Sequence, residues 1–408
     1  MRYQHNGVSD EWWTQEVLDQ KRRLDQYADV PTVFSSGWFD CFVAEVTWQF
    51  AQMTARSRSP QRLIVGPWNH GGMRGGASHM VEVEFGAAAA WGSRVYNAER
   101  LRWFDRWLRD VPTGVEADAP VRLFVMGGGS GRRDKAGHLD HGGTWRTETS
   151  WPPPRAVPTA HYLASGGRLA TRPLDTTDAA ISWTHDPEHP VPTIGASVAA
   201  FFEWIPLPDG VDPAYVSGRA RMRGFLPDGP MHQRERKELL GCASPYPLLS
   251  QRADVMVFQT ETLAADVEIV GPIEAWLFVS SDMPDTDFTA KLIDVHPPTS
   301  DDPEGFHMNL CDAILRMRFR EGLDRERPME PGRIYEIAIE LPPTANLFKA
   351  GHRIRVDIAS SNFPQFDVNP NTGEALGRHT HKRRARNSVH VGPSQPSRVM
   401  LSVMPARN

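Results

Sequence analysis

The sequence predicts two parts in succession, a short α/β unit and then a larger all-β sandwich of the jelly-roll type. Three observations predict this class. Residues 31–65 have the pattern strand, helix, strand. After residue 114 no convincing long helix is found, and short alternating runs are separated by Gly, Pro and Asp. At 408 residues the chain is also too long for one compact core.

The α/β unit begins with a short apolar run, residues 31–36, which has strand character. Residues 61–65 form a second run of this kind. Between them, residues 43–56 place apolar side chains at i, i+3, i+7 and i+10, which is one face of a helix. These side chains are Val43, Val46, Phe50 and Met53. Two strands joined through a helix are expected to be parallel, with a right-handed crossover.

A longer amphipathic stretch, residues 88–109, is expected to cover this sheet as a final helix. Its apolar face carries Ala98, Leu101, Phe104 and Leu108. Beyond it, residues 121–125 and 353–358 alternate apolar and polar side chains with a period of two, as strands do. Many short strands with turn residues between them are typical of a β-sandwich or jelly roll.

Two motifs carry the chemistry of the chain. Gly37-Trp38-Phe39-Asp40 follows the first strand, and Gly66-Pro67-Trp68-Asn69-His70 follows the second. Because the carboxyl ends of parallel strands meet at one edge of a sheet, we expect Asp40 and His70 to lie together. Acid followed by base is the order of the last two members of an α/β-hydrolase Ser-Asp-His triad. No Gly-x-Ser-x-Gly nucleophile motif occurs in these residues.

In such a triad His70 would take the proton of the serine hydroxyl and deliver it to the leaving group. Asp40 would fix the imidazole tautomer and stabilise the imidazolium. Each residue alone has a simpler interpretation, since an Asp after a strand is often a helix cap. Cys41 or Ser36 acting as nucleophile with His70 is a further alternative. Neither sits on a strand–elbow–helix turn, which argues against it.

Four aromatic residues flank the two candidates and could line an acyl pocket or belong to the core. These are Trp38, Phe39, Phe42 and Trp68.

Composition excludes several other functions. The net charge of -5 argues against nucleic acid as the main partner. No apolar run approaches the roughly 20 residues that span a bilayer, and residues 1–5 show no secretion signal, so we expect a cytoplasmic protein without membrane contact.

The three cysteines are too far apart for a zinc site. His138-Leu139-Asp140-His141 contains metal-ligand residue types but no helical context, so we expect neither a metal nor a cofactor.

The order of motifs resembles the cocaine-esterase / X-Pro dipeptidyl-peptidase family of serine hydrolases, from about residue 28 onward. Besides the two motifs above, the matching segments are residues 121–127, 185–187, 190–192, 285–292, 351–354 and 360–364. The resemblance implies an α/β-hydrolase domain with a helical cap and a C-terminal jelly roll, which in this family is a galactose-binding-like fold. The family's N-terminal strands, nucleophile elbow and most of its cap have no counterpart in these residues.

By this resemblance, residues 1–29 are a remnant of the cap and its return segment. Residues 30–114 are the C-terminal part of the hydrolase domain, and residues 115–408 are the jelly roll. Asp40 and His70 correspond to the triad acid and base. Phe42, with Phe201 and Phe202 from the jelly roll, corresponds to substrate-binding positions.

The resulting hypothesis is the C-terminal portion of a serine hydrolase that cleaves small acyl esters, amides or short peptides, including X-Pro dipeptidyl bonds. A complementary N-terminal half would supply the serine. The alternative is a non-catalytic remnant whose jelly roll serves as a binding module.

Overall fold

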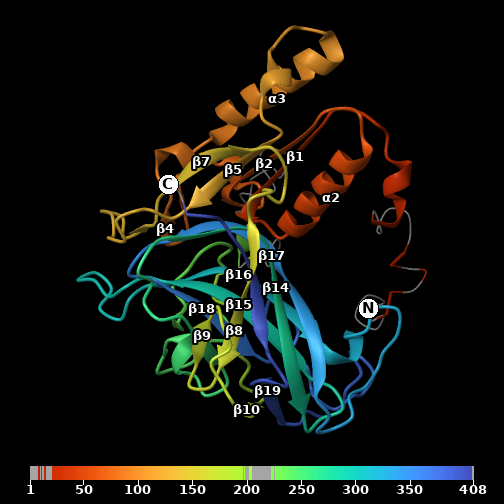
Figure 1. Cartoon of the computed structure of the whole chain (residues 1–408), viewed down its shortest axis with the longest axis vertical. Coiled ribbons are helices and arrows are strands. Elements are labelled where there is room, and N and C mark those ends of the chain that lie inside the picture. Colours follow the sequence, from red (N-terminus) through yellow and green to blue (C-terminus); the bar gives the residue numbers. More distant parts are fainter. Residues whose placement is uncertain are drawn as a thin grey trace, which may run out of the picture.

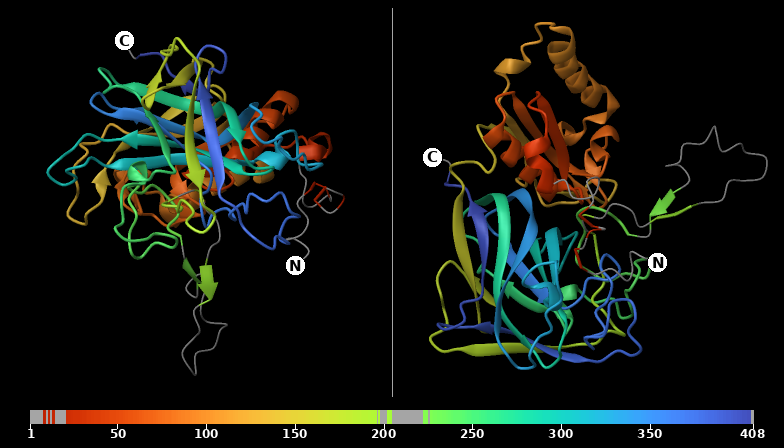
Figure 2. Two further views of the ribbon diagram at one scale, coloured as in Figure 1. Left: turned by 90° about the horizontal axis from the view of Figure 1, so that it is seen from below. Right: turned by 90° about the vertical axis from the view of Figure 1, so that its right-hand side faces the viewer.

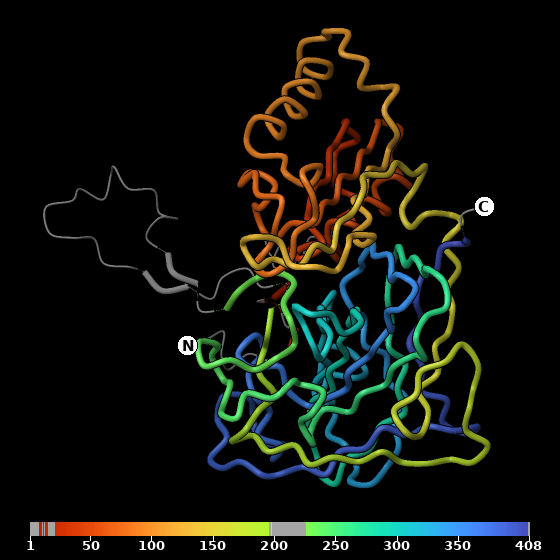
Figure 3. Tube along the Cα trace, turned by 90° about the vertical axis from the view of Figure 1, so that its left-hand side faces the viewer, coloured from red at the N-terminus to blue at the C-terminus, as the bar shows by residue number. Residues whose placement is uncertain are grey.

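The protein is described by a computed structural model that covers most of the chain. The described residues are 8–9, 11, 13–14, 21–195, 197, 202–204, 222–224 and 226–406. They form two parts stacked along the longest axis, an α/β part drawn red to orange and a β-sandwich drawn mostly green to blue (Figure 1). Figure 3 shows the same stack from another side. In the described part of the chain, no helix combines the length and apolarity needed to cross a bilayer.

The α/β part is built on three parallel strands in the order β1-β2-β5. Its main elements are β1 (Thr32–Phe39), α2 (Val43–Arg56), β2 (Gln61–Asn69), α3 (Gly92–Arg109) and β5 (Val121–Met126). The prediction of a parallel strand–helix–strand unit is confirmed, and α2 has the predicted bounds. A 3₁₀-helix, η1 (Lys21–Gln26), precedes β1. Most of the predicted return segment, residues 1–29, lies outside the described residues.

Helix α3 differs from the expectation in the face that it buries. Leu101 is 61% exposed and Leu108 is 76% exposed, whereas Trp103 is the buried residue of this helix. The guanidinium of Arg102 donates to both carboxylate oxygens of Asp118. This ion pair and Trp103 fix the orientation of α3, so the apolar stripe with Leu101 and Leu108 faces solvent. In Figure 2, right, α3 runs along the outer side of the sheet.

The second part is a sandwich of mostly antiparallel strands, as predicted. One layer is centred on β14, which pairs with β17, β19 and β20, and the other on β15, which pairs with β16 and β18. The strands of these layers are β14 (Val267–Ser281), β15 (Asp287–Val295), β16 (His307–Arg316), β17 (Tyr335–Phe348), β18 (Arg353–Ala359), β19 (Ala385–Val391) and β20 (Arg398–Val403). Further strands are β8 (Val157–Ala164), β9 (Arg168–Ala170), β10 (Ala179–His185) and β13 (Met256–Gln259). β11 (Phe202–Trp204) and β12 (Met222–Gly224) form a separate two-stranded sheet, and β7 (Gly143–Glu148) pairs with β5 of the α/β part.

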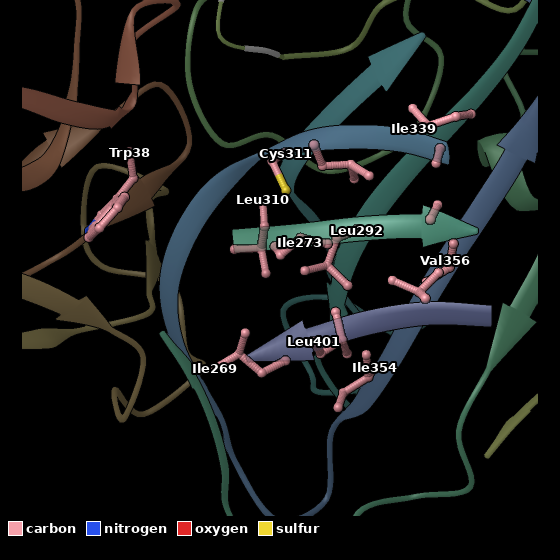
Figure 4. Packing of buried hydrophobic residues seen from close by; sticks show 14 of the residues in the cluster. Trp38, Ile269, Ile273, Leu292, Leu310, Cys311, Ile339, Ile354, Val356 and Leu401 are labelled. Carbon is pink, nitrogen blue, oxygen red and sulfur yellow. The ribbon is translucent and has the colours of Figure 1, made fainter. Parts of the chain in front are cut away.

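The core of the sandwich lies between these two layers. Along β14, side chains from Ile273 to Val279 are alternately buried and partly exposed, the period-two pattern of a strand with one face in a core. Figure 4 shows Ile269 and Ile273 of β14 and Leu292 of β15 among the buried side chains of this cluster. Trp38, in β1, stands apart from this group.

The two parts are joined by hydrogen-bonded strands. β5 pairs in parallel with β2 on one side, and Asn346 of β17 pairs with Met126 at the end of β5. A separate three-stranded sheet, β3 (His79–Met80), β4 (Val83–Glu84) and β6 (Leu139–Asp140), lies beside this junction (Figure 1).

Candidate active site

Asp40 and His70 leave the same edge of the parallel sheet. Phe39 and Asn69 are the last paired residues of β1 and β2. The residues that follow them, Asp40 and His70, therefore lie beside each other. The Nδ1 atom of His70 lies 3.3 Å from each carboxylate oxygen of Asp40. The sequence thus predicted the placement of these two residues correctly.

The Asp40 carboxylate is held by the turn that follows β1. Asp40 is 7% exposed, and its Oδ1 accepts a hydrogen bond from the Phe42 backbone N–H at 3.0 Å. Its own N–H donates to the carbonyl of Gly37 at 2.9 Å. The Asp40 carbonyl accepts from Val43, the first residue of α2. These main-chain hydrogen bonds hold the Asp40 carboxylate in position independently of His70.

His70 has the orientation that a general base requires. A proton on Nδ1 can be shared between the two Asp40 oxygens, which places the lone pair of the neutral ring on Nε2. The His70 side chain is 53% exposed. The ring of Phe42 meets it edge to face, with ring centroids 5.3 Å apart. The 3.3 Å contact is longer than a strong N–H···O bond, as is common in structures without substrate.

Two glycines make room for the backbone and the ring of Trp68 beside the site. A Cβ on Gly37 would lie 1.9 Å from the carbonyl oxygen of Trp68, and one on Gly66 would lie 2.5 Å from the Trp68 ring. A side chain at Gly37 would push apart the two segments that carry Asp40 and His70, and one at Gly66 would displace the Trp68 ring of its own strand. The glycines of the two motifs are therefore explained by packing.

Three of the four flanking aromatic residues belong to the core in this structure. Trp38, Phe39 and Trp68 are at most 1% exposed. The indole N–H of Trp38 donates to the Phe124 carbonyl at 2.7 Å, and that of Trp68 donates to the Ala89 carbonyl at 2.9 Å. Of the two interpretations left open by the sequence, the geometry favours the core for these three.

The remaining predicted pocket residues are placed differently. Phe42 is 50% exposed and contacts His70, so a ligand can reach it. Phe202 lies at the start of β11, and only its backbone is described. Phe201 lies outside the described residues.

Sequence reasoning missed the residues that support the core aromatics. Phe85 packs against Phe39, and Trp91 and Trp145 pack against Trp68. They come from distant segments, and no spacing rule in the sequence connects them.

The alternative nucleophiles within this chain fit poorly. Burial and the neighbouring Asp40 carboxylate raise the pKa of the Cys41 thiol to about 12, so it is protonated at neutral pH. Ser36 is 2% exposed within β1, and its hydroxyl has no hydrogen-bond partner in the described part of the chain. Both side chains lack the activation that a nucleophile needs.

A groove of about 290 Å³ lies between α3 and the strands β1 and β2, lined by Val33, Ile64 and Trp103 among others. Its lining includes neither Asp40 nor His70, so the acid–base pair lies outside it.

Family models match both parts of the chain. Residues 113–400 match the model of the X-Pro dipeptidyl-peptidase C-terminal non-catalytic domain, and residues 1–72 match that of the X-Pro dipeptidyl-peptidase S15 family. The chain belongs to the cocaine esterase and X-Pro dipeptidyl-peptidase (S15) family. It is 34% identical over 406 residues to cocaine esterase from Rhodococcus sp. (strain MB1 Bresler), an alignment that covers 97% of this chain and 60% of that protein.

Two solved structures share the fold. An aminopeptidase from a marine sediment archaeon, Thaumarchaeota archaeon, superimposes with a TM-score of 0.75 at 22% identity, covering 99% of this chain and 59% of that one. An α-amino acid ester hydrolase superimposes with a TM-score of 0.74 at 23% identity, covering 98% and 60%. The S15-family chain described here thus spans about 60% of the length of these relatives.

Proposed function

We propose that this chain contributes the acid and the base of a serine hydrolase that cleaves ester or amide bonds. Asp40 orients the imidazole, His70 is the general base, and the serine comes from a complementary hydrolase segment. The observation that carries this proposal is the contact of His70 Nδ1 with both oxygens of the buried Asp40 carboxylate at 3.3 Å.

The chemistry follows from the tautomer. With Nδ1–H directed at Asp40, Nε2 can remove the proton from a serine hydroxyl as that oxygen attacks the carbonyl carbon of the substrate. The imidazolium formed in this step is stabilised by the Asp40 carboxylate. It then protonates the leaving alcohol or amine, and a water molecule repeats the sequence to release the acid.

Two features of the α/β part support a complementary segment. In the order of the described strands, β1 is the terminal strand and pairs only with β2. An open edge of a parallel sheet offers N–H and C=O groups to a further strand. The exposed apolar residues of α3, Leu101 and Leu108, add a surface that a neighbouring segment could cover.

The test is hydrolysis of a simple aryl ester by the purified chain, alone and mixed with the N-terminal half of a family member. We expect activity only in the mixture, and we expect Asp40→Ala and His70→Ala to abolish it. A control is the pair of partly buried Asp186 and exposed His189, in which His189 Nδ1 lies 3.5 Å from Asp186 Oδ2. Alanine at Asp186 or His189 should leave the rate unchanged. Activity of the chain alone that survives both active-site changes would overturn the proposal.

A second candidate is a non-catalytic binding module. The observation that favours it is the match of residues 113–400 to a domain described as non-catalytic. A folded chain that remains inactive with and without the complementary half would support this alternative.

A further inference from the structure

We propose that His79, Glu84 and His138 form a binding site for a zinc-type divalent metal ion beside the junction of the two parts. One potential ligand atom from each residue lies within 4.8 Å of the other two. All three side chains are partly buried and accessible from solvent. The inference does not rest on the proposed hydrolase function.

The small sheet β3-β4-β6 brings these residues together. His79 and Glu84 are directly opposite each other in the antiparallel pair of β3 and β4, so their side chains share one face. Glu84 is also paired with Asp140 of β6, and His138 precedes Asp140 by two residues. Residues two apart in an extended chain point to the same face, which places His138 with the other two.

The two imidazole rings are already adjacent. The centroids of His79 and His138 are 4.2 Å apart and the ring planes differ by 14°. Ligand atoms around a zinc ion at 2.0–2.2 Å are about 3.4 Å apart, so these atoms must approach one another by on the order of 1 Å. The imidazole lone pairs lie in the ring planes, so the stacked rings must also rotate until both planes meet at the ion. Partly exposed side chains can make this rotation.

A neighbouring carboxylate orients His138 for metal binding. Asp134 Oδ2 lies 3.3 Å from His138 Nδ1, which leaves Nε2 as the ligand nitrogen. The Asp134 carboxylate also accepts backbone N–H bonds from Ala136 and His138, which hold it in position. In zinc sites, the ring nitrogen of a ligand histidine that does not bind the metal commonly donates a hydrogen bond to a carboxylate.

Glu84 is held in place in the same way. The Gly86 backbone N–H donates to its Oε1 at 2.7 Å, and the Ser78 hydroxyl donates to its Oε2 at 2.9 Å. Each oxygen keeps a second lone pair for a cation. Two imidazoles and one carboxylate form a ligand set that suits zinc, with the fourth position left to water.

The other histidine group in the described chain is less suited to a metal. His141, Asp294 and His296 are fully buried, and their polar atoms are largely used within the protein. His141 contacts His296 at 3.2 Å and Asn346 at 2.8 Å, and Asp294 binds His352 at 2.7 Å. These hydrogen bonds describe a structural network.

Metal binding would tie together segments that are far apart in sequence. The loop between β3 and β4 reaches the sandwich, where Glu82 accepts a hydrogen bond from the His232 backbone N–H at 2.7 Å. An ion on His79 and Glu84 would connect this loop, which follows His70, to the segment that leads into β7. We therefore expect the ion to stabilise the fold.

The test is titration of the untagged, chelator-stripped chain with Zn²⁺ in competition with a chromophoric chelator. We expect one ion per chain and an increase in Tm. His79→Ala, His138→Ala and Glu84→Gln should each weaken binding at least tenfold, and Asp134→Asn about 10- to 100-fold. Bound Co²⁺ should give the visible spectrum of a tetrahedral site, whereas Mg²⁺ and Ca²⁺ should not compete.

Control variants make the result specific to this site. His379→Ala and His381→Ala change exposed histidines elsewhere and should leave zinc affinity unchanged. The metal-free Tm of each ligand variant verifies that it folds. Affinity that persists in the His79→Ala/His138→Ala double variant, or that is lost in His141→Gln instead, would overturn the proposal.

Discussion

Gly37 and Trp68 are in contact through their main chains, so that a Cβ on Gly37 would lie 1.9 Å from the Trp68 carbonyl oxygen. This contact sets the spacing of the two strands from which Asp40 and His70 emerge. The catalytic geometry proposed here is thus determined two to three residues before each functional side chain.

Gly37→Ala is expected to destabilise the protein by more than about 3 kcal/mol, above the range of ordinary overpacking, because the collision is with backbone. The measurement is urea unfolding. Gly332→Ala is the matched control, since φ is +83° there but no atom lies within 4 Å of the added Cβ. It should cost only about 1–2 kcal/mol of backbone strain. Equal losses in the two variants would contradict the prediction.

Asp40→Asn is expected to lower kcat of the complemented enzyme by about 10,000-fold, with little change in KM. The amide would favour the wrong imidazole tautomer, and a serine protease triad loses activity to this extent on the same change. The measurement is steady-state hydrolysis of an aryl ester. Asp186→Asn, at the other His–Asp pair, should have the kcat of the unmodified protein. A loss smaller than tenfold would remove Asp40 from the triad.

Phe42→Ala tests whether this residue contacts substrate. Because Phe42 is half exposed, the free energy of unfolding should change by less than about 1 kcal/mol. KM for an aryl ester should rise about tenfold or more through lost apolar contact. Phe42→Leu keeps much of the apolar bulk and should restore most of the affinity. A large loss of stability with unchanged KM would instead make Phe42 a core residue.

His185 should make the protein sensitive to acid. Burial lowers its pKa from 6.5 to about 4, so the folded state keeps the ring neutral while the unfolded state binds a proton below pH 6.5. Stability present above pH 6.5 is therefore lost as pH falls from 6.5 to 4, by up to about 3 kcal/mol, and this contribution is flat below pH 4. His185→Gln should show a shallower pH dependence of the urea midpoint in that window. An unchanged slope would exclude this linkage.

The sequence predicted those elements whose signal is local. α2 and the strands around it follow from residue spacing, and Asp40 and His70 follow from where two parallel strands end. The orientation of α3 could not be predicted in this way, because the spacing of apolar residues does not reveal whether another segment packs on them. Arg102 and Trp103 decide that orientation through contacts with more distant residues.

The roles of the aromatic residues depend on tertiary contacts as well. Trp68 is buried because Trp91 and Trp145 pack on it, a fact that no spacing in the sequence contains. The grouping of His79, Glu84 and His138 was missed for a related reason. Strands of two residues are too short to show a period, so their pairing could not be predicted.

The strand β5 belongs to the sheet that carries His70, although it follows residue 114 in the chain. It pairs with β2 on one edge and with β7 on the other, whereas its pairing with β17 is limited to Met126 and Asn346. A cut near residue 114 that separated the two parts would remove β2 from the edge of β5. It would also favour aggregation through Val121 and Leu123, both of which are buried in the intact chain.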